Sequence, residues 1–285
     1  MINAQILELK AEILSELGLI DQAIQTYREL RKVHHSDFTV RSLEQYNNLR
    51  AKQLLLKVIA DKNIKPQNIQ SSIKEIVHDF DSLLLIGSTP ERLSILGGAY
   101  KKIALINFNR NAFSNKKALI KSSLKTALSY YIRACNMVDP KDIKALNYPL
   151  LNALTIHAML STEKNIQLFK NKPILVSKLL SDAKNDIINL PDRFVDFWKD
   201  VNLVNAMQCE LLYAKDKDIV LLKEEIIRKY SRVWTLSGTL KQLQTKQEHL
   251  DFLVMGVEMM DRPVKWKKKM REVISEMKME FGKLG

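Results

Sequence analysis

The amino-acid sequence predicts an all-α protein, built as an α-solenoid in which antiparallel helix pairs stack side by side and a last helix pair caps the end. Three observations support this fold class. Apolar residues recur at the three- and four-residue spacing of helices that bury one face. The 285 residues include only eight Gly and seven Pro, too few for the frequent turns of an all-β chain. These residues lie at intervals, as expected for long helices joined by short loops.

Composition indicates an ordinary globular protein with a marked positive charge. The chain is 46% hydrophobic and 27% charged, and its formal net charge is +13. This charge favours an acidic or anionic partner, although lysines that only solvate helix faces would give the same excess. The sequence has no basic-apolar leader and no apolar run of about 18 residues, so we expect a cytoplasmic protein with no membrane partner. Cys135 and Cys209 lie in apolar helical patterns, which predicts buried free thiols.

Residues 2–35 contain the first predicted helix pair. Gly18 is expected to end its first helix in a left-handed conformation, and Asp21 to cap the second. Seven positions follow the spacing of the tetratricopeptide repeat (TPR). They are Leu7, Ala11, Leu14, Gly18, Ala23, Tyr27 and Leu30.

Two more helices are predicted before the centre of the chain, and Pro66 lies in the break between them. This break is the best candidate for a boundary. We therefore divide the chain into an N-terminal part (1–62), a central TPR-like solenoid with an extended basic hairpin (67–233) and C-terminal capping helices (234–285). Together they are expected to form one continuous solenoid. The helices are predicted over 37–60, 67–86, 174–190, 219–234, 237–260 and 264–284, and another begins at 191.

The stretch from Arg92 to Val138 is the centre of the chain. Thr89 and Pro90 precede it as the N-cap and first residue of a helix. The stretch repeats the TPR spacing, but its helices are longer than usual, with the hairpin tip at residues 109–115. The TPR positions are Leu93, Leu96, Gly97 and Tyr100 in the first helix, and Ala127, Tyr131 and Ala134 in the second.

The same stretch contains no Asp or Glu, although the whole chain has 32 acidic residues. Lys101 and Lys102 occupy repeat positions that usually face the groove, and Arg92 lies one turn further up. Tyr148, followed by Pro149, is interpreted as the start of the next helix, which puts Asn152 on the same rim. We predict that these side chains hold a phosphate or an acidic peptide, with an aromatic face for stacking. The predicted ligand-binding residues are Arg92, Lys101, Lys102, Tyr148, Asn152 and Trp198.

A second basic surface follows from the four-residue spacing of Lys117, Lys121 and Lys125. This spacing puts them on the helix face opposite Ala127 and Tyr131, where they are expected to be exposed to a partner protein or a nucleic acid. Purely structural roles stay open for both surfaces. Under that alternative the aromatic residues anchor the core and the lysines are solvated.

No catalytic constellation is found in the sequence. The five histidines do not pair with Cys, Asp or another His at the spacing of metal ligands. No P-loop, dinucleotide fingerprint or nucleophile elbow occurs. We therefore expect no enzymatic activity, no bound metal and no cofactor.

Several short motifs resemble the TRAFs-binding, TPR-containing family over roughly residues 70–245. The motifs are Thr89-Pro90-Glu91-Arg92-Leu93, Leu96-Gly97, Tyr100-Lys101-Lys102, Tyr148-Pro149-Leu150-Leu151-Asn152-Ala153 and Phe197-Trp198, followed by Glu210 and Tyr230. Leu150 stands where the family usually has Gly. That family includes the central regulatory region of apoptosis signal-regulating kinases. It also includes bacterial TPR modules linked to conflict and anti-phage (antiviral defence) systems, for which nucleotide sensing has been proposed.

The resemblance implies a regulatory α-solenoid and not a catalyst. Our leading hypothesis is an adaptor or sensor subunit that docks an effector protein and binds a nucleotide-like anion in its basic central groove. The alternative is a nucleic-acid-binding accessory subunit of a larger effector complex.

Overall fold

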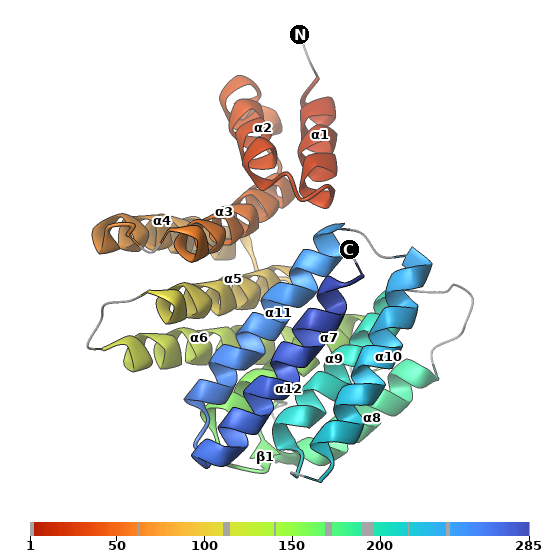
Figure 1. The fold of residues 1–285 in the computed structure, drawn as a ribbon. Coiled ribbons are helices and arrows are strands. Elements are labelled where there is room, and N and C mark those ends of the chain that lie inside the picture. Colours follow the sequence, from red (N-terminus) through yellow and green to blue (C-terminus); the bar gives the residue numbers. More distant parts are fainter. Residues whose placement is uncertain are drawn as a thin grey trace. The chain divides into compact units, whose positions relative to one another are not determined.

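The computed structural model describes residues 3–61, 63–110, 115–139, 141–168, 173–189, 197–215, 217–237 and 240–284. The described residues form twelve α-helices, one 3-10 turn (His35–Asp37) and two strands of two residues each, so the all-α prediction is confirmed (Figure 1). The chain divides into two compact units, Met1–Ala127 and Leu128–Gly285. This division falls inside a helix, and each unit is described by itself. The predicted segment boundaries stay a prediction.

Unit 1 contains five helices and the first half of a sixth. They are α1 (Ala4–Glu16), α2 (Ile20–Val33), α3 (Val40–Ala60), α4 (Pro66–Ile86), α5 (Pro90–Asn109) and α6 (Lys116–Met137). The α1–α2 hairpin is the first repeat, and α3 contacts α2, α4 and α5. The predicted TPR positions Leu7, Ala11, Ala23 and Tyr27 are buried between α1 and α2.

Two local predictions in the first hairpin have opposite outcomes. Gly18 has a φ of 75°, the left-handed conformation expected at the end of α1. The prediction that Asp21 caps α2 is wrong, because α2 begins at Ile20 and has no side-chain cap. The Asp21 carboxylate instead accepts a hydrogen bond from the Gln53 amide of α3.

The start of the central pair follows its sequence signals. The Thr89 hydroxyl accepts a hydrogen bond from the Arg92 backbone N–H at 3.1 Å, and Pro90 is the first residue of α5. Leu93 and Ala127 are fully buried, as predicted for repeat positions. The helices α5 and α6 end and begin at the predicted hairpin tip, of which residues 111–114 lie outside the described part.

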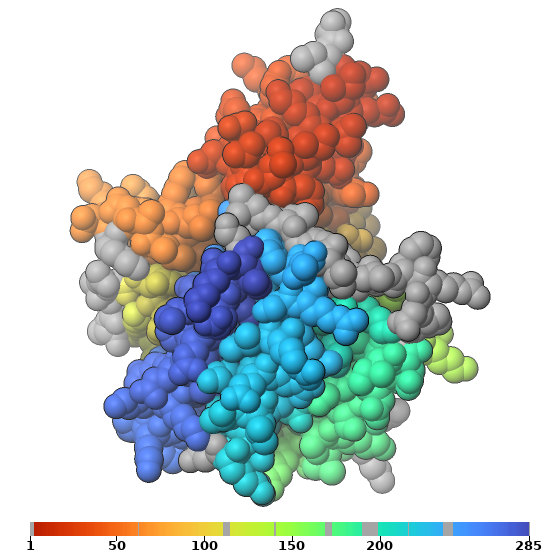
Figure 2. All heavy atoms as spheres, turned by 45° about the vertical axis from the view of Figure 1, so that its right-hand side comes forward, coloured from red at the N-terminus to blue at the C-terminus, as the bar shows by residue number. Residues whose placement is uncertain are grey.

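Unit 2 contains the second half of α6 and six further helices. They are α7 (Ile143–Leu160), α8 (Val176–Ile188), α9 (Phe197–Tyr213), α10 (Ile219–Ser237), α11 (Leu240–Met259) and α12 (Val264–Gly282). Helix α9 packs against α7, α8 and α10, whereas α12 packs against α10 and α11. Side chains of α10, α11 and α12 form one face of this unit (Figure 2).

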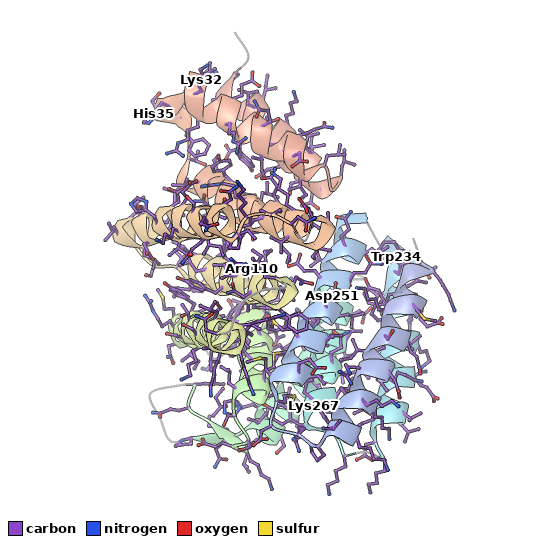
Figure 3. The ribbon with its side chains drawn as sticks, turned by 60° about the vertical axis from the view of Figure 1, so that its left-hand side comes forward. Lys32, His35, Arg110, Trp234, Asp251 and Lys267 are labelled. Atoms are coloured by element: carbon purple, nitrogen blue, oxygen red, sulfur yellow. The ribbon has the colours of Figure 1, made fainter. Side chains whose placement is uncertain are left out.

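Polar contacts fix the ends of this layer. The Trp234 indole N–H donates to the Leu284 carbonyl at 2.6 Å, which joins the end of α10 to the end of α12. At the opposite end, the Lys267 ammonium donates to the Glu258 carbonyl at 3.1 Å and joins α12 to α11 (Figure 3). The layer is therefore held at both ends.

The junction from α7 to α8 differs from the prediction in two ways. Pro149 lies inside α7 and not at its start, because Asp142 caps a helix that begins one and a half turns earlier. The ring leaves one helical hydrogen bond unmade. Between the helices, strands β1 (Asn165–Ile166) and β2 (Ile174–Leu175) form a short antiparallel pair, so the helix predicted over 174–190 begins at Val176.

Both cysteines are buried and free, as predicted. Burial raises the pKa of the Cys135 thiol to about 12, and burial likewise raises the pKa of the Cys209 thiol to about 12. The thiols therefore stay protonated at neutral pH and serve as small apolar core groups.

Candidate functional site

Arg92 was predicted to bind a ligand, but its side chain is buried and bound to other groups of the protein. The side chain is only 8% exposed, and its Nε donates to the Glu44 carboxylate at 2.6 Å. Its Nη1 donates to the backbone carbonyls of Leu83, at 3.3 Å, and Gly87. Its charge is therefore neutralised by Glu44 of α3, and its Nη1 binds the end of α4. Glu44 lies 48 residues from Arg92 along the chain, and no local pattern in the sequence links the two.

Lys101 and Lys102 are half-buried on α5, in unit 1. The Lys102 ammonium donates to the Asn48 side-chain oxygen of α3 at 3.2 Å. Both lysines already interact with other groups of the chain. An anion at this position would therefore have to share these donors.

Tyr148 and Asn152 lie one turn apart on α7, in unit 2. The Tyr148 side chain is 48% exposed, and its ring meets the ring of Tyr131 edge-on, with centroids 6.2 Å apart. The Asn152 amide donates to the Tyr148 carbonyl at 2.8 Å, back along its own helix. Trp198 is the second residue of α9, and its side chain lies outside the described part. That Tyr148 and Asn152 share a groove with Lys101 stays a prediction.

Burial controls the protonation of the Tyr131 phenol. Desolvation raises the pKa of Tyr131 well above its ordinary value, with a smaller effect from Tyr148. Burial also raises the pKa of Tyr148. Both phenols therefore stay neutral. The half-exposed Tyr148 could orient an anion by hydrogen bonding without repelling it, whereas Tyr131 is fully buried.

The three lysines of α6 form an exposed surface, which we call the α6 lysine face. Lys117, Lys121 and Lys125 are all exposed, and the positions beside them, Ala118 and Ser122, are small, neutral and exposed. None of the three lysines forms an ion pair with the residues that the structure describes. The opposite face of α6, which includes Ile120, Leu124 and Ala127, is buried. The predicted exposed stripe is present.

The start of α6 has an unusual electrostatic pattern. Lys116 and Lys117 are its first two residues, and its first turn has no acidic residue. The backbone dipole gives a helix N-terminus a partial positive charge, so each cation there costs about 0.3–1 kcal/mol. Lys116 is partly accommodated by the ring of Phe108, 5.2 Å from its ammonium. Lys117 has no such contact within the described residues.

Unit 2 also contains a groove that the sequence did not predict. Its volume is about 1340 Å³, and its lining residues run from Ala158 to Trp266. The last turns of α7 and α9, the first turns of α10 and α12 and the whole length of α8 form its walls, together with β2. The sequence could not indicate it because its walls come from segments far apart along the chain.

The described residues contain no cluster of three or more His, Cys, Asp or Glu side chains that could hold a metal ion. Nor does any of their helices combine the length and apolar character needed to cross a membrane.

The fold and the repeat positions define a class of TPR-like proteins built from helical hairpins. The family model described as Tetratricopeptide Repeats-Sensor (TPR-S) matches residues 19–157. This match supports a TPR-like sensor or adaptor role. It confirms the resemblance to TPR sensor-like proteins, although it begins and ends earlier than the 70–245 first identified. No curated protein and no solved structure matched the chain.

Proposed function

We propose that the chain is a non-catalytic sensor or adaptor that docks an acidic surface of a partner protein on the α6 lysine face. The observation that carries this proposal is the cationic surface at the start of α6, where Lys117, Lys121 and Lys125 form no ion pair with described residues. Local physical chemistry favours acidic residues at a helix N-terminus, yet this helix has lysines there. Residues that break a local rule without a local gain often serve function.

The geometry of the α6 lysine face suits a protein helix. Lys117 and Lys125 are eight residues apart, so the face spans about 12 Å in steps of about 6 Å. Carboxylates placed every fourth residue along a partner helix have the same step. Because Ala118 and Ser122 are small, a partner helix can approach the backbone closely between the lysines.

Photo-crosslinking tests this surface directly. A benzoylphenylalanine residue replaces Ser122 within the face, and a matched chain carries it at the exposed Ser71 of α4. We expect benzoylphenylalanine at position 122, and not at position 71, to crosslink to an acidic protein in the producing cells. The triple reversal Lys117→Glu/Lys121→Glu/Lys125→Glu should abolish this product. The triple reversal Lys10→Glu/Lys57→Glu/Lys268→Glu has the same change of net charge and is the control. Equal products from both positions, or a product that survives the reversal within the face, would contradict the proposal.

The sensor part of the proposal is a nucleotide-like anion that binds near Lys101 and Lys102. Two consecutive lysines of α5 support it, and a bound anion would act by shifting the population of unit 1 conformations. Calorimetry with ATP and with signalling dinucleotides tests it. We expect heat of binding that is lost in Lys101→Ala/Lys102→Ala and retained in Lys10→Ala/Lys57→Ala. No heat and no change of melting temperature would remove the small-ligand part while leaving the docking part standing.

Nucleic-acid binding is the second candidate function, because the α6 lysine face would also attract phosphates. Three phosphate contacts predict a slope of about −2.7 for the logarithm of affinity against the logarithm of salt concentration. Titration of a 30-base-pair duplex measures this slope. A slope near this value that is lost in the triple reversal would favour nucleic acid over a protein partner.

A further inference from the structure

The groove of unit 2 lies at the end where several helices begin or finish. Its residues come from the end of α7, strand β2, helix α8, the end of α9 and the starts of α10 and α12. These segments meet at the end of unit 2 marked by β1 (Figure 1). The groove lies outside residues 19–157, and all its lining residues belong to unit 2.

Large apolar side chains at this groove are exposed to solvent. Leu175 of β2 is 50% exposed, Ile188 of α8 is 56% exposed and Leu221 of α10 is 69% exposed. More deeply set apolar residues, including Val176 and Trp266, continue the same surface inwards. Single exposed leucines need no explanation, but several that gather in one hollow indicate an interaction site.

The charges around the groove are mostly positive. Six basic side chains line it, and Lys184 is the one paired with a carboxylate of the lining, Glu210, at 2.6 Å. Among the described residues the other five form no ion pair, and they are Lys164, Lys215, Lys217, Arg262 and Lys265.

Fewer carboxylates oppose them. Glu210 is paired with Lys184, and Glu225 lies 4.0 Å from Lys229. Glu163 and Asp218 are the remaining acidic residues of the lining. Among the described lining residues, five cations without an ion pair face two such carboxylates, which leaves the groove with a positive field.

One cation is held in place by an aromatic ring. The Arg262 guanidinium lies over the Trp266 ring, 5.4 Å from its centroid. This contact keeps the planar, donor-rich group at the groove margin, where it can bind a carboxylate with two parallel hydrogen bonds.

We propose that this groove docks an acidic, amphipathic segment of a partner protein. Its large apolar side chains would cover Leu175, Ile188 and Leu221, and its carboxylates would bind the surrounding cations. The volume of about 1340 Å³ exceeds the range of about 300–1,000 Å³ typical of small-molecule pockets, which favours a peptide. An amphipathic helix in an apolar groove is a recurring mode of peptide recognition.

This surface is distinct from the α6 lysine face, because the two belong to different units. The inference therefore does not depend on the proposed function. Variants of the groove and of α6 test the two surfaces separately.

Selection from a random peptide display library against the full chain provides the test. We expect enriched peptides that combine Asp or Glu with large apolar residues and that compete with one another. Leu221→Ser and Lys217→Glu should each weaken their binding about tenfold, which corresponds to about 1.4 kcal/mol. Leu85→Ser, at a leucine that is 90% exposed in unit 1, and Lys10→Glu are the matched controls and should change it less than about twofold.

Three outcomes would overturn the inference. One is a selection whose peptides bind Leu221→Ser as well as the parent chain. Another is enrichment of basic or wholly polar peptides. The third is a chain that dimerises through this groove, shown by ultracentrifugation in which Leu221→Ser is monomeric and the parent is not. Because Leu221 is exposed, its replacement should leave the circular dichroism and melting temperature unchanged, so loss of binding cannot be ascribed to misfolding.

Discussion

The buried ion pair between Arg92 and Glu44 gives the sharpest prediction for unit 1. The two side chains are 8% and 7% exposed, and their charged atoms are 2.6 Å apart. Glu44→Leu removes the carboxylate and leaves the guanidinium buried with only the carbonyls of Leu83 and Gly87 as acceptors. Arg92→Met leaves the carboxylate buried and unpaired.

The magnitude follows from this burial. Removing one partner of a buried ion pair costs about 3–5 kcal/mol, because the remaining charge has lost its compensation. An exposed pair would cost about 0–1 kcal/mol. The double variant Glu44→Leu/Arg92→Met should lose less than the two single losses combined, since no charge stays behind. It should still be less stable than the parent, because two carbonyls lose their donor.

Urea unfolding followed by far-UV circular dichroism measures these values for the parent, both single variants and the double variant. We expect a coupling free energy of at least about 1 kcal/mol from the double-mutant cycle. The surface pair of Arg41 and Glu12, whose arginine is 73% exposed, is the matched control. A loss below about 1 kcal/mol for Arg92→Met would refute the structural role of this pair and return Arg92 to the candidate ligand site.

Further predictions concern caps, packing and thiols. Thr89→Ala should lower the free energy of unfolding by about 1 kcal/mol in urea titrations, whereas Thr89→Ser should not. Gly256→Ala should cost about 1–3 kcal/mol, because the new Cβ would lie 2.7 Å from Cγ of the buried Met159; equal or greater stability would contradict this packing. Cys135 and Cys209 should resist Ellman's reagent at pH 8 until the chain is unfolded, and rapid reaction of the native chain would be inconsistent with their burial. Burial raises the pKa of both from 9.0 to about 12, so their stabilising contribution is full below pH 9 and falls by about 1.4 kcal/mol per thiol and pH unit up to pH 12. Unfolding titrations of the parent and of Cys135→Ala/Cys209→Ala should diverge in this window.

Local signals in the sequence predicted the helix ends well where the partner groups are close along the chain. Gly18 and Thr89 act within their own turns, and both have the predicted roles. The prediction that Asp21 caps α2 was wrong, because the helix already begins at Ile20. The amide of Gln53, 32 residues away, binds the Asp21 carboxylate instead. The prediction that a helix begins at Tyr148 and Pro149 was wrong, because the cap at Asp142 makes α7 begin earlier.

The candidate sites also differ in how far apart their residues lie along the chain, and this decides which of them could be predicted. The α6 lysine face could be predicted, because a four-residue spacing within one helix determines which side chains share a face. The role of Arg92 could not, because its partner Glu44 is 48 residues away. The groove of unit 2 was missed for the same reason: the exposure of Leu175 and Leu221 depends on how six separate segments end, and no local pattern records this.

The central claim is that the lysines of α6 serve binding and not stability, and Lys117→Glu tests it most directly. We predict a free energy of unfolding higher by about 0.5–1.5 kcal/mol, because the carboxylate suits the helix N-terminus and can pair with Lys121 one turn on. In the same variant the crosslink from position 122 to its acidic partner should fall about tenfold, because like charges then face each other. A less stable chain with an unchanged crosslink would contradict the account.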